Sequence, residues 1–186
     1  MPQIDPLDAA VVEFFHHRWN LPTVRALVRS SGARVVSLVH ELGVARSVLR
    51  VSIDALGELG LIEPNPGHGH PLRPELVPTG RGRDIDPPSE DYLNAVDAPD
   101  LATRKWTAPV IGAVADDDRF NAIQRRLGVS PRALSQTLEA LADAGLVVRE
   151  TDDGRPPRSR YALTKAGARA SEAVTAMARV LTRTGS

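Results

Sequence analysis

The sequence predicts a mainly α-helical protein with small β-hairpins, an α+β fold built from two tandem units of one design. Apolar residues recur at helical spacing through most of the 186 residues, whereas short stretches rich in Val, Leu and Tyr flank turn residues such as Asp-Gly. The same succession of leucines and glycines also occurs twice, at an offset of 85 residues.

The repeat is clearest between residues 41–62 and residues 126–147, where eight positions are identical, including two pairs of glycines. The same offset also matches residues outside that block, for example Thr79 with Thr164. We therefore expect three parts: an N-terminal domain over residues 1–83, an acidic linker over residues 84–103 and a C-terminal domain over residues 104–186.

The second copy shows how each helix is predicted. Residues 105–114 and 119–127 carry apolar side chains at helical spacing, and Gly128 supplies the turn that follows them. Ser130 is a suitable N-cap with Pro131 at the first helical position, so a third helix is expected over residues 131–144.

A hairpin follows these helices. Residues 146–150 and 159–164 have strand composition, and the segment between them contains an Asp-Gly turn signal. A helix-turn-helix followed by a hairpin is the winged-helix arrangement, so each copy is predicted to be a winged helix-turn-helix domain.

Both ends of the chain are predicted to be helical. Asp5 and Thr164 are suitable N-caps, and the helix after Asp5 is expected to bury Leu7, Val11 and Phe14. The C-terminal helix is expected to bury a second apolar stripe, Ala170, Ala173, Val174, Met177 and Val180 or Leu181. The linker is expected to be mostly irregular, with a short helix near residues 90–96.

Composition excludes several classes of function. The chain has no cysteine, no apolar run long enough to span a bilayer and no signal-peptide pattern, so we expect no membrane partner and a cytoplasmic location. It has no Gly-rich phosphate loop and no catalytic constellation, so we expect no enzyme and no cofactor. His68 and His70, with His16 and His17, lack the further ligands of a zinc site, and no metal is expected.

Charge is unevenly distributed although the chain is neutral overall. Residues 84–103 contain six acidic and no basic residues, whereas residues 104–186 contain 14 basic and nine acidic residues. The second half is therefore where a polyanion would bind.

The second copy resembles the HxlR family of bacterial winged-helix transcriptional regulators, within the MarR-like superfamily. The resemblance covers roughly residues 104–183 and rests on the order of Lys-Trp-Thr, Arg-Phe-Asn, the Ser130 cap and Pro-Pro-Arg before Tyr-Ala-Leu-Thr. It implies a sequence-specific regulator of double-stranded DNA. The first copy departs from the pattern, since Val35 replaces Phe120 and Ala45 replaces Ser130.

In a winged helix the recognition helix enters the major groove and the wing meets the adjacent backbone. The helix over residues 131–144 is thus expected to read bases, and the wing over residues 149–163 to contact phosphates. The candidate DNA-binding residues are Ser130, Arg132, Ser135, Gln136, Arg155, Arg158 and Arg160, with Arg46, Ser47, Arg50 and Arg73 in the first copy.

Several alternatives remain open from the sequence. Instead of a DNA-binding regulator, the chain would be a tandem winged-helix adaptor that binds proteins. Such an adaptor would be similar in architecture to the ScpB subunit of bacterial condensin complexes. In the HxlR family, terminal helices form a homodimer; here they would pair within one chain, giving a pseudo-dimeric monomer, or between two chains. A small-molecule effector is also left open.

Overall fold

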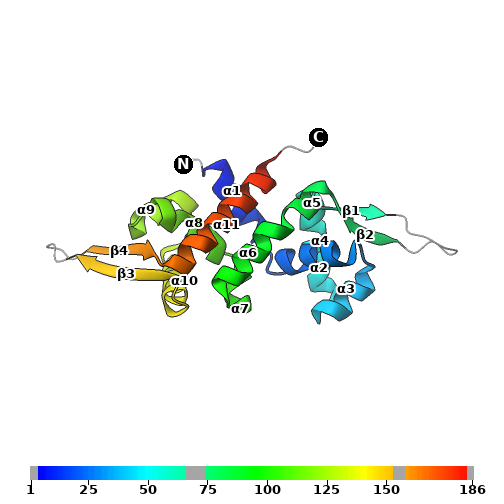
Figure 1. Ribbon diagram of the computed structural model, residues 1–186, viewed down its shortest axis with the longest axis horizontal. Helices are drawn as coiled ribbons and strands as arrows, with labels where there is room; N and C mark the ends of the chain where they lie inside the picture. The colour runs from blue at the N-terminus through cyan, green and yellow to red at the C-terminus, as the bar shows by residue number, and fades with distance from the viewer. Residues whose placement is uncertain (1–3, 66–73, 153–157, 184–186) are drawn as a thin grey trace.

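A computed structural model describes residues 4–65, 74–152 and 158–183. The molecule is elongated, with one β-hairpin toward each end and a group of packed helices in the middle (Figure 1). Helices dominate, and the described strands form two antiparallel pairs, so the predicted α+β winged helix-turn-helix class is confirmed.

Each hairpin completes a unit of three helices and two strands. The first unit consists of α2 (Asn20–Ser30), α3 (Val35–Leu42), α4 (Arg46–Glu58), β1 (Ile62–Asn65) and β2 (Glu75–Pro78). The second unit consists of α8 (Thr107–Asp116), α9 (Phe120–Leu127), α10 (Pro131–Asp143), β3 (Val147–Asp152) and β4 (Arg158–Leu163).

The two units match in detail at the offset found in the sequence. Ile62 pairs with Pro78 in the first hairpin, and Val147 pairs with Leu163 in the second. Gly43 and Gly128 end α3 and α9 with φ angles of 62° and 61°, a left-handed conformation that favours glycine. Both helix-turn-helix segments therefore have the same backbone conformation at the turn.

The centre of the molecule is made by helices outside the two units. They are α1 (Pro6–Phe14), α5 (Gly80–Asp84), α6 (Asp86–Val96), α7 (Pro99–Ala102) and α11 (Lys165–Thr182). The long helix α11 packs against α6, α1 and α8, and its buried side chains include Met177. Because α1 contacts α8 and α11 although it begins the chain, both ends of the chain meet in one core (Figure 1).

The linker is largely helical, so the expectation of a mostly irregular connector is wrong. Helices α6 and α7 occupy most of it, and Tyr92 is fully buried with its hydroxyl donating to the Ala102 carbonyl at 3.0 Å. Burial raises the pKa of Tyr92. The helices form because they cover α11, a contact across about 80 residues of sequence that local composition does not reveal.

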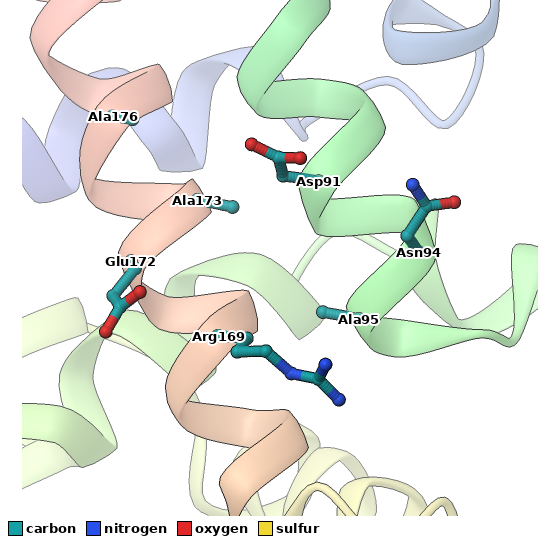
Figure 2. Close-up of a pocket in the computed structure, with 7 residues that line it drawn as sticks. All are labelled: Asp91, Asn94, Ala95, Arg169, Glu172, Ala173 and Ala176. Atoms are coloured by element: carbon teal, nitrogen blue, oxygen red, sulfur yellow. The ribbon is translucent and has the colours of Figure 1, made fainter.

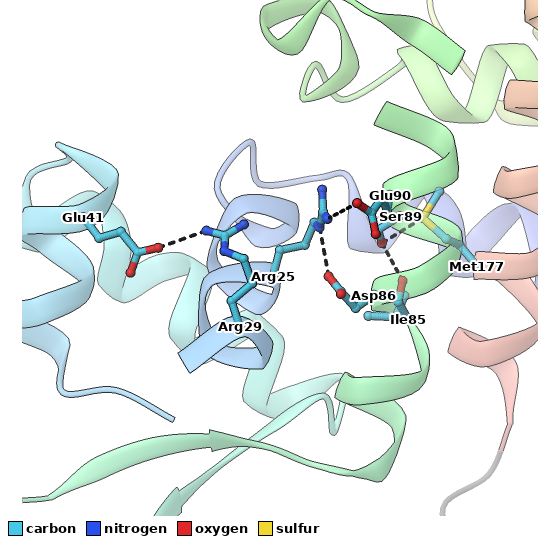
Figure 3. A network of polar contacts seen from close by, with 8 residues as sticks. All are labelled: Arg25, Arg29, Glu41, Ile85, Asp86, Ser89, Glu90 and Met177. Atoms are coloured by element: carbon cyan, nitrogen blue, oxygen red, sulfur yellow. Dashed lines mark hydrogen bonds and ion pairs between the residues drawn. The ribbon is translucent and has the colours of Figure 1, made fainter. Parts of the chain in front are cut away.

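Polar contacts fasten α6 to its neighbours. The Arg25 guanidinium of α2 lies between two carboxylates of α6, donating to Asp86 at 2.9 Å and approaching Glu90 at 3.9 Å (Figure 3). On the other side of α6, the Ser89 hydroxyl contacts the Met177 sulfur of α11 at 3.5 Å. The acidic residues of this segment thus join the first unit to α6, and Ser89 joins α6 to α11.

The terminal helices are capped as predicted, but one face was assigned incorrectly. Asp5 accepts from the Leu7 amide, and Thr164 accepts from the Gly167 amide. Leu7 is exposed rather than buried, because the side of α1 that faces inward carries Asp8 beside Val11 and Phe14. In the part of the chain that is described, no helix is long and apolar enough to cross a membrane.

Candidate nucleic-acid interface

Helix α10 presents a polar face to solvent. The Ala133 amide donates to the Ser130 hydroxyl at 3.3 Å, which starts the helix, and Leu134, Leu138 and Leu141 are buried. This packing directs the opposite side outward, where three predicted residues are exposed: Arg132, Ser135 and Gln136. An exposed helix carrying hydrogen-bonding side chains has the chemistry needed to read base edges.

A basic cluster lies between α9 and the wing. Arg119, Arg125 and Ser159 line one open pocket, and Arg149 of β3 donates twice to the Ser159 hydroxyl, at 3.0 and 2.7 Å. We call Arg119, Arg125 and Arg149 the wing-side arginines. Sequence reasoning did not select Arg119 or Arg125, since only the strand pairing of Arg119 with Arg160 brings the start of α9 beside the wing.

Arg160 is less available than expected. Its guanidinium donates to the Asp118 carboxylate at 3.0 Å, so part of its charge is already balanced. Arg158 is placed in β4, but its side chain lies outside the described part, as do Arg155 and Arg73 as whole residues. Their predicted phosphate contacts therefore remain predictions.

The first unit presents a different surface. Arg46, Ser47 and Arg50 are exposed on α4 as predicted, but two neighbouring valines are exposed as well, Val48 at 44% and Val51 at 48%. The corresponding positions of α10 are Ala133 and Gln136. Helix α4 also starts at Ala45 without a side-chain cap. The exposed side of α4 thus carries both charged and apolar groups, whereas the exposed side of α10 is mainly polar.

Comparison with known proteins agrees with this geometry. The HxlR-like helix-turn-helix family pattern matches residues 101–185. HTH-type transcriptional regulators named YtfH, from Escherichia coli (strain K12) and Shigella flexneri, are each 33% identical to the chain over 93 residues, covering 49% of the chain and 69% of the relative. The chain belongs to the HxlR family. It is accordingly a non-enzymatic, DNA-binding transcriptional regulator.

One partly buried ion pair holds the helix-turn-helix of this HxlR protein to the N-terminal helix. Arg126 of α9 donates to both carboxylate oxygens of Asp8, at 2.6 and 3.1 Å, and to Asp116 at 2.7 Å. The hydrogen bond to Asp8 is the main reason that the pKa of Arg126 is raised. The pair spans 118 residues of sequence, so no local pattern could have indicated it.

Trp106 packs against the core just behind α10 and is half-buried. The Lys105 ammonium lies 5.0 Å from the centre of its ring, within cation–π range. A small pocket between this tryptophan and α10 is lined in part by Gln136. The tryptophan therefore supports the position of α10, as expected for a core residue.

A third hollow lies between α6 and α11 (Figure 2). The hollow is lined by alanines and by exposed charged residues. Asp91 and Glu172 are negatively charged, and Arg169 is positively charged. This mixture selects neither an anion nor a cation, and we assign it no ligand. Among the described residues, no group of three or more His, Cys, Asp or Glu side chains is arranged to hold a metal ion.

Proposed function

We propose that this HxlR-family regulator reads double-stranded DNA through its second unit, with helix 131–144 in the major groove and wing 149–163 on the phosphate backbone. The observation that carries the proposal is the adjacency of two surfaces. The exposed polar face of α10 follows directly in the chain from α9, beside which the wing-side arginines gather. Base reading and phosphate binding both need such an arrangement.

The two surfaces have different roles in this proposal. Arg132 pairs with guanine and Gln136 with adenine, since these side chains match the acceptor and donor patterns of those bases. Ser135 contributes a further hydrogen bond, and Ser130 leaves amide groups at the start of α10 near a phosphate. The wing-side arginines, together with Arg155, Arg158 and Arg160, bind phosphates without regard to sequence.

We further propose that the chain arose by tandem duplication and that its terminal helices pair within one chain, so that each chain is a pseudo-dimer. The offset of 85 residues, the matching strand registers and the paired glycine turns support a common origin for the two units. The packing of α11 on α6 and α1 supports closure within one chain. The domains would be residues 1–83 and 104–186, joined through residues 84–103. As a regulator of the bacterial chromosome it would act in the cytoplasm.

Binding to a pool of random duplex DNA tests the proposal. About five phosphate contacts would make log K fall with log salt at a slope near −4 to −5, and sequencing of the bound fraction would yield a motif. Arg125→Ala is expected to weaken binding to all duplexes and reduce the slope by about one, whereas Gln136→Ala relaxes one base position by about 1–3 kcal/mol. Arg179→Ala, an exposed arginine on α11, is the matched control.

Two results would contradict the proposal. If the intact chain fails to bind duplex DNA even at low salt, a protein-binding adaptor becomes the better description. If Gln136→Ala and Arg125→Ala lower affinity equally for every sequence, α10 does not read bases.

A further inference from the structure

The exposed side of α4 combines an apolar centre with an ordered row of charges. Val48 and Val51 are exposed in its middle, and Ala55 continues their stripe one turn later. Beside this stripe, four charged residues follow one another at intervals of four, with both arginines preceding both acids: Arg46, Arg50, Asp54 and Glu58. Residues four apart lie on the same side of a helix, so the row has a positive half and a negative half.

The charged row is only weakly satisfied within its own helix. Arg50 and Asp54 approach to 3.9 Å, and their side chains are 81% and 66% exposed. An exposed pair at this distance contributes little energy. For Arg46 and Glu58 no ion pair is formed among the described residues. These charges therefore remain available to a partner.

A two-fold axis makes this surface complementary to itself. If two α4 helices lie antiparallel about an axis at the level of Ser52, Arg50 of one copy faces Asp54 of the other, and Arg46 lies at the same level as Glu58. The apolar stripes then meet in the middle. A surface whose charges change sign about its own midpoint fits an identical copy of itself, which is the requirement of an isologous interface.

We propose that the α4 face of the first unit is a contact site for a second copy of this chain. Nucleic acid fits the face less well, because two acidic groups and two valines share it with the arginines. A single pair of 13-residue helices buries less area than a standard interface, so the association should be weak, with Kd on the order of 10 µM.

The contact would give the regulator two reading units. Two chains joined through α4 carry two α10 helices related by the same two-fold axis, which suits an operator with inverted half-sites. This consequence rests on the proposed function, whereas the contact itself does not. Self-association in the absence of DNA therefore tests the contact separately.

Sedimentation velocity of the intact chain, up to about 200 µM, is the decisive measurement. We expect the sedimentation coefficient of the unaltered chain to rise with concentration. Arg50→Asp and Asp54→Arg should each weaken association by about tenfold, because each places like charges opposite one another. Mixing the two variants in equal amounts should restore association, since position 50 of each chain then faces an opposite charge at position 54 of the other. The double variant should associate alone for the same reason.

Two further variants complete the test. Val51→Gln introduces the residue that α10 carries at the same position and should weaken association, while circular dichroism checks that the fold is kept. Arg132→Asp should leave self-association unchanged and weaken DNA binding. The inference is overturned if the unaltered chain stays monomeric through this range, if the single variants associate like it, or if their mixture does not regain association.

Discussion

At the scale of single residues, Gly167 and Gly82 leave no room for a side chain. A Cβ at Gly167 would lie 2.0 Å from the Leu146 carbonyl oxygen, and one at Gly82 would lie 1.9 Å from that of Leu61. We expect Gly167→Ala to lower the free energy of unfolding by about 3 kcal/mol, since backbone must move. Gly57→Ala, with nothing within 4 Å, should raise it by about 0.5 kcal/mol. Urea unfolding measures the stability of both variants. If the two substitutions change stability equally, the close approach at Gly167 is not what requires a glycine there.

Arg126 provides a second prediction at this scale. Arg126→Met leaves the Asp8 carboxylate, which is only 10% exposed, without its partner. We expect the free energy of unfolding to fall by about 2 kcal/mol, because an unpaired buried charge is costly. Adding Asp8→Leu should recover part of the loss, since it removes that charge. If the double variant loses more free energy of unfolding than the two single variants lose together, the Arg126–Asp8 ion pair does not explain the destabilisation.

At the scale of elements, the two units offer a matched pair of helix starts. Ala45 and Ser130 have nearly the same backbone angles, φ −61° and ψ 139° against φ −66° and ψ 147°, but only Ser130 caps its helix. We expect Ala45→Ser to stabilise the chain by about 1 kcal/mol and Ser130→Ala to destabilise it by a similar amount. Thermal unfolding followed by circular dichroism measures the stability change of both variants. If Ala45→Ser leaves the stability unchanged, α4 gains nothing from a side-chain cap.

The elements also show which parts of the fold could be predicted from sequence. Helices α9 and α10 have local signals, including the glycine turn at Gly128 and the Ser130 cap, and both were predicted to within a residue or two. Helix α6 was predicted only in part, over residues 90–96, because its packing against α11 is not visible in the local sequence. Local sequence patterns predict the helices of each unit well. They do not indicate which distant segments of the chain pack against one another.

The same distinction applies to the site. The outward direction of Arg132, Ser135 and Gln136 followed from the apolar stripe on the opposite side of α10. The wing-side cluster did not, since Arg119 and Arg125 reach the wing through strand pairing 41 residues away in sequence, and Asp118 balances Arg160 through that same pairing. Composition indicated that the second half of the chain is basic, but not which arginines the fold brings together beside the wing.

At the scale of the whole molecule, α11 joins the two units into one core. Met177 is fully buried and contacts Ser89 of α6, and Arg81 of α5, the helix that follows the first unit, donates to the Leu181 carbonyl at 2.6 Å. We expect Met177→Ala to lower the free energy of unfolding by about 3 kcal/mol and to leave a single calorimetric transition, because both units share this core. Two separate transitions would show that the units unfold independently.

Positions 51 and 136 occupy the same place in the two units, yet one is an apolar valine and the other a glutamine. In an assembly of identical subunits, every substitution appears in all copies at once, so a change that improves one surface alters its symmetry mate. A chain that contains both units is free of that constraint. Natural selection can adjust the two helices separately, and a single gene can encode a division of labour that identical subunits cannot.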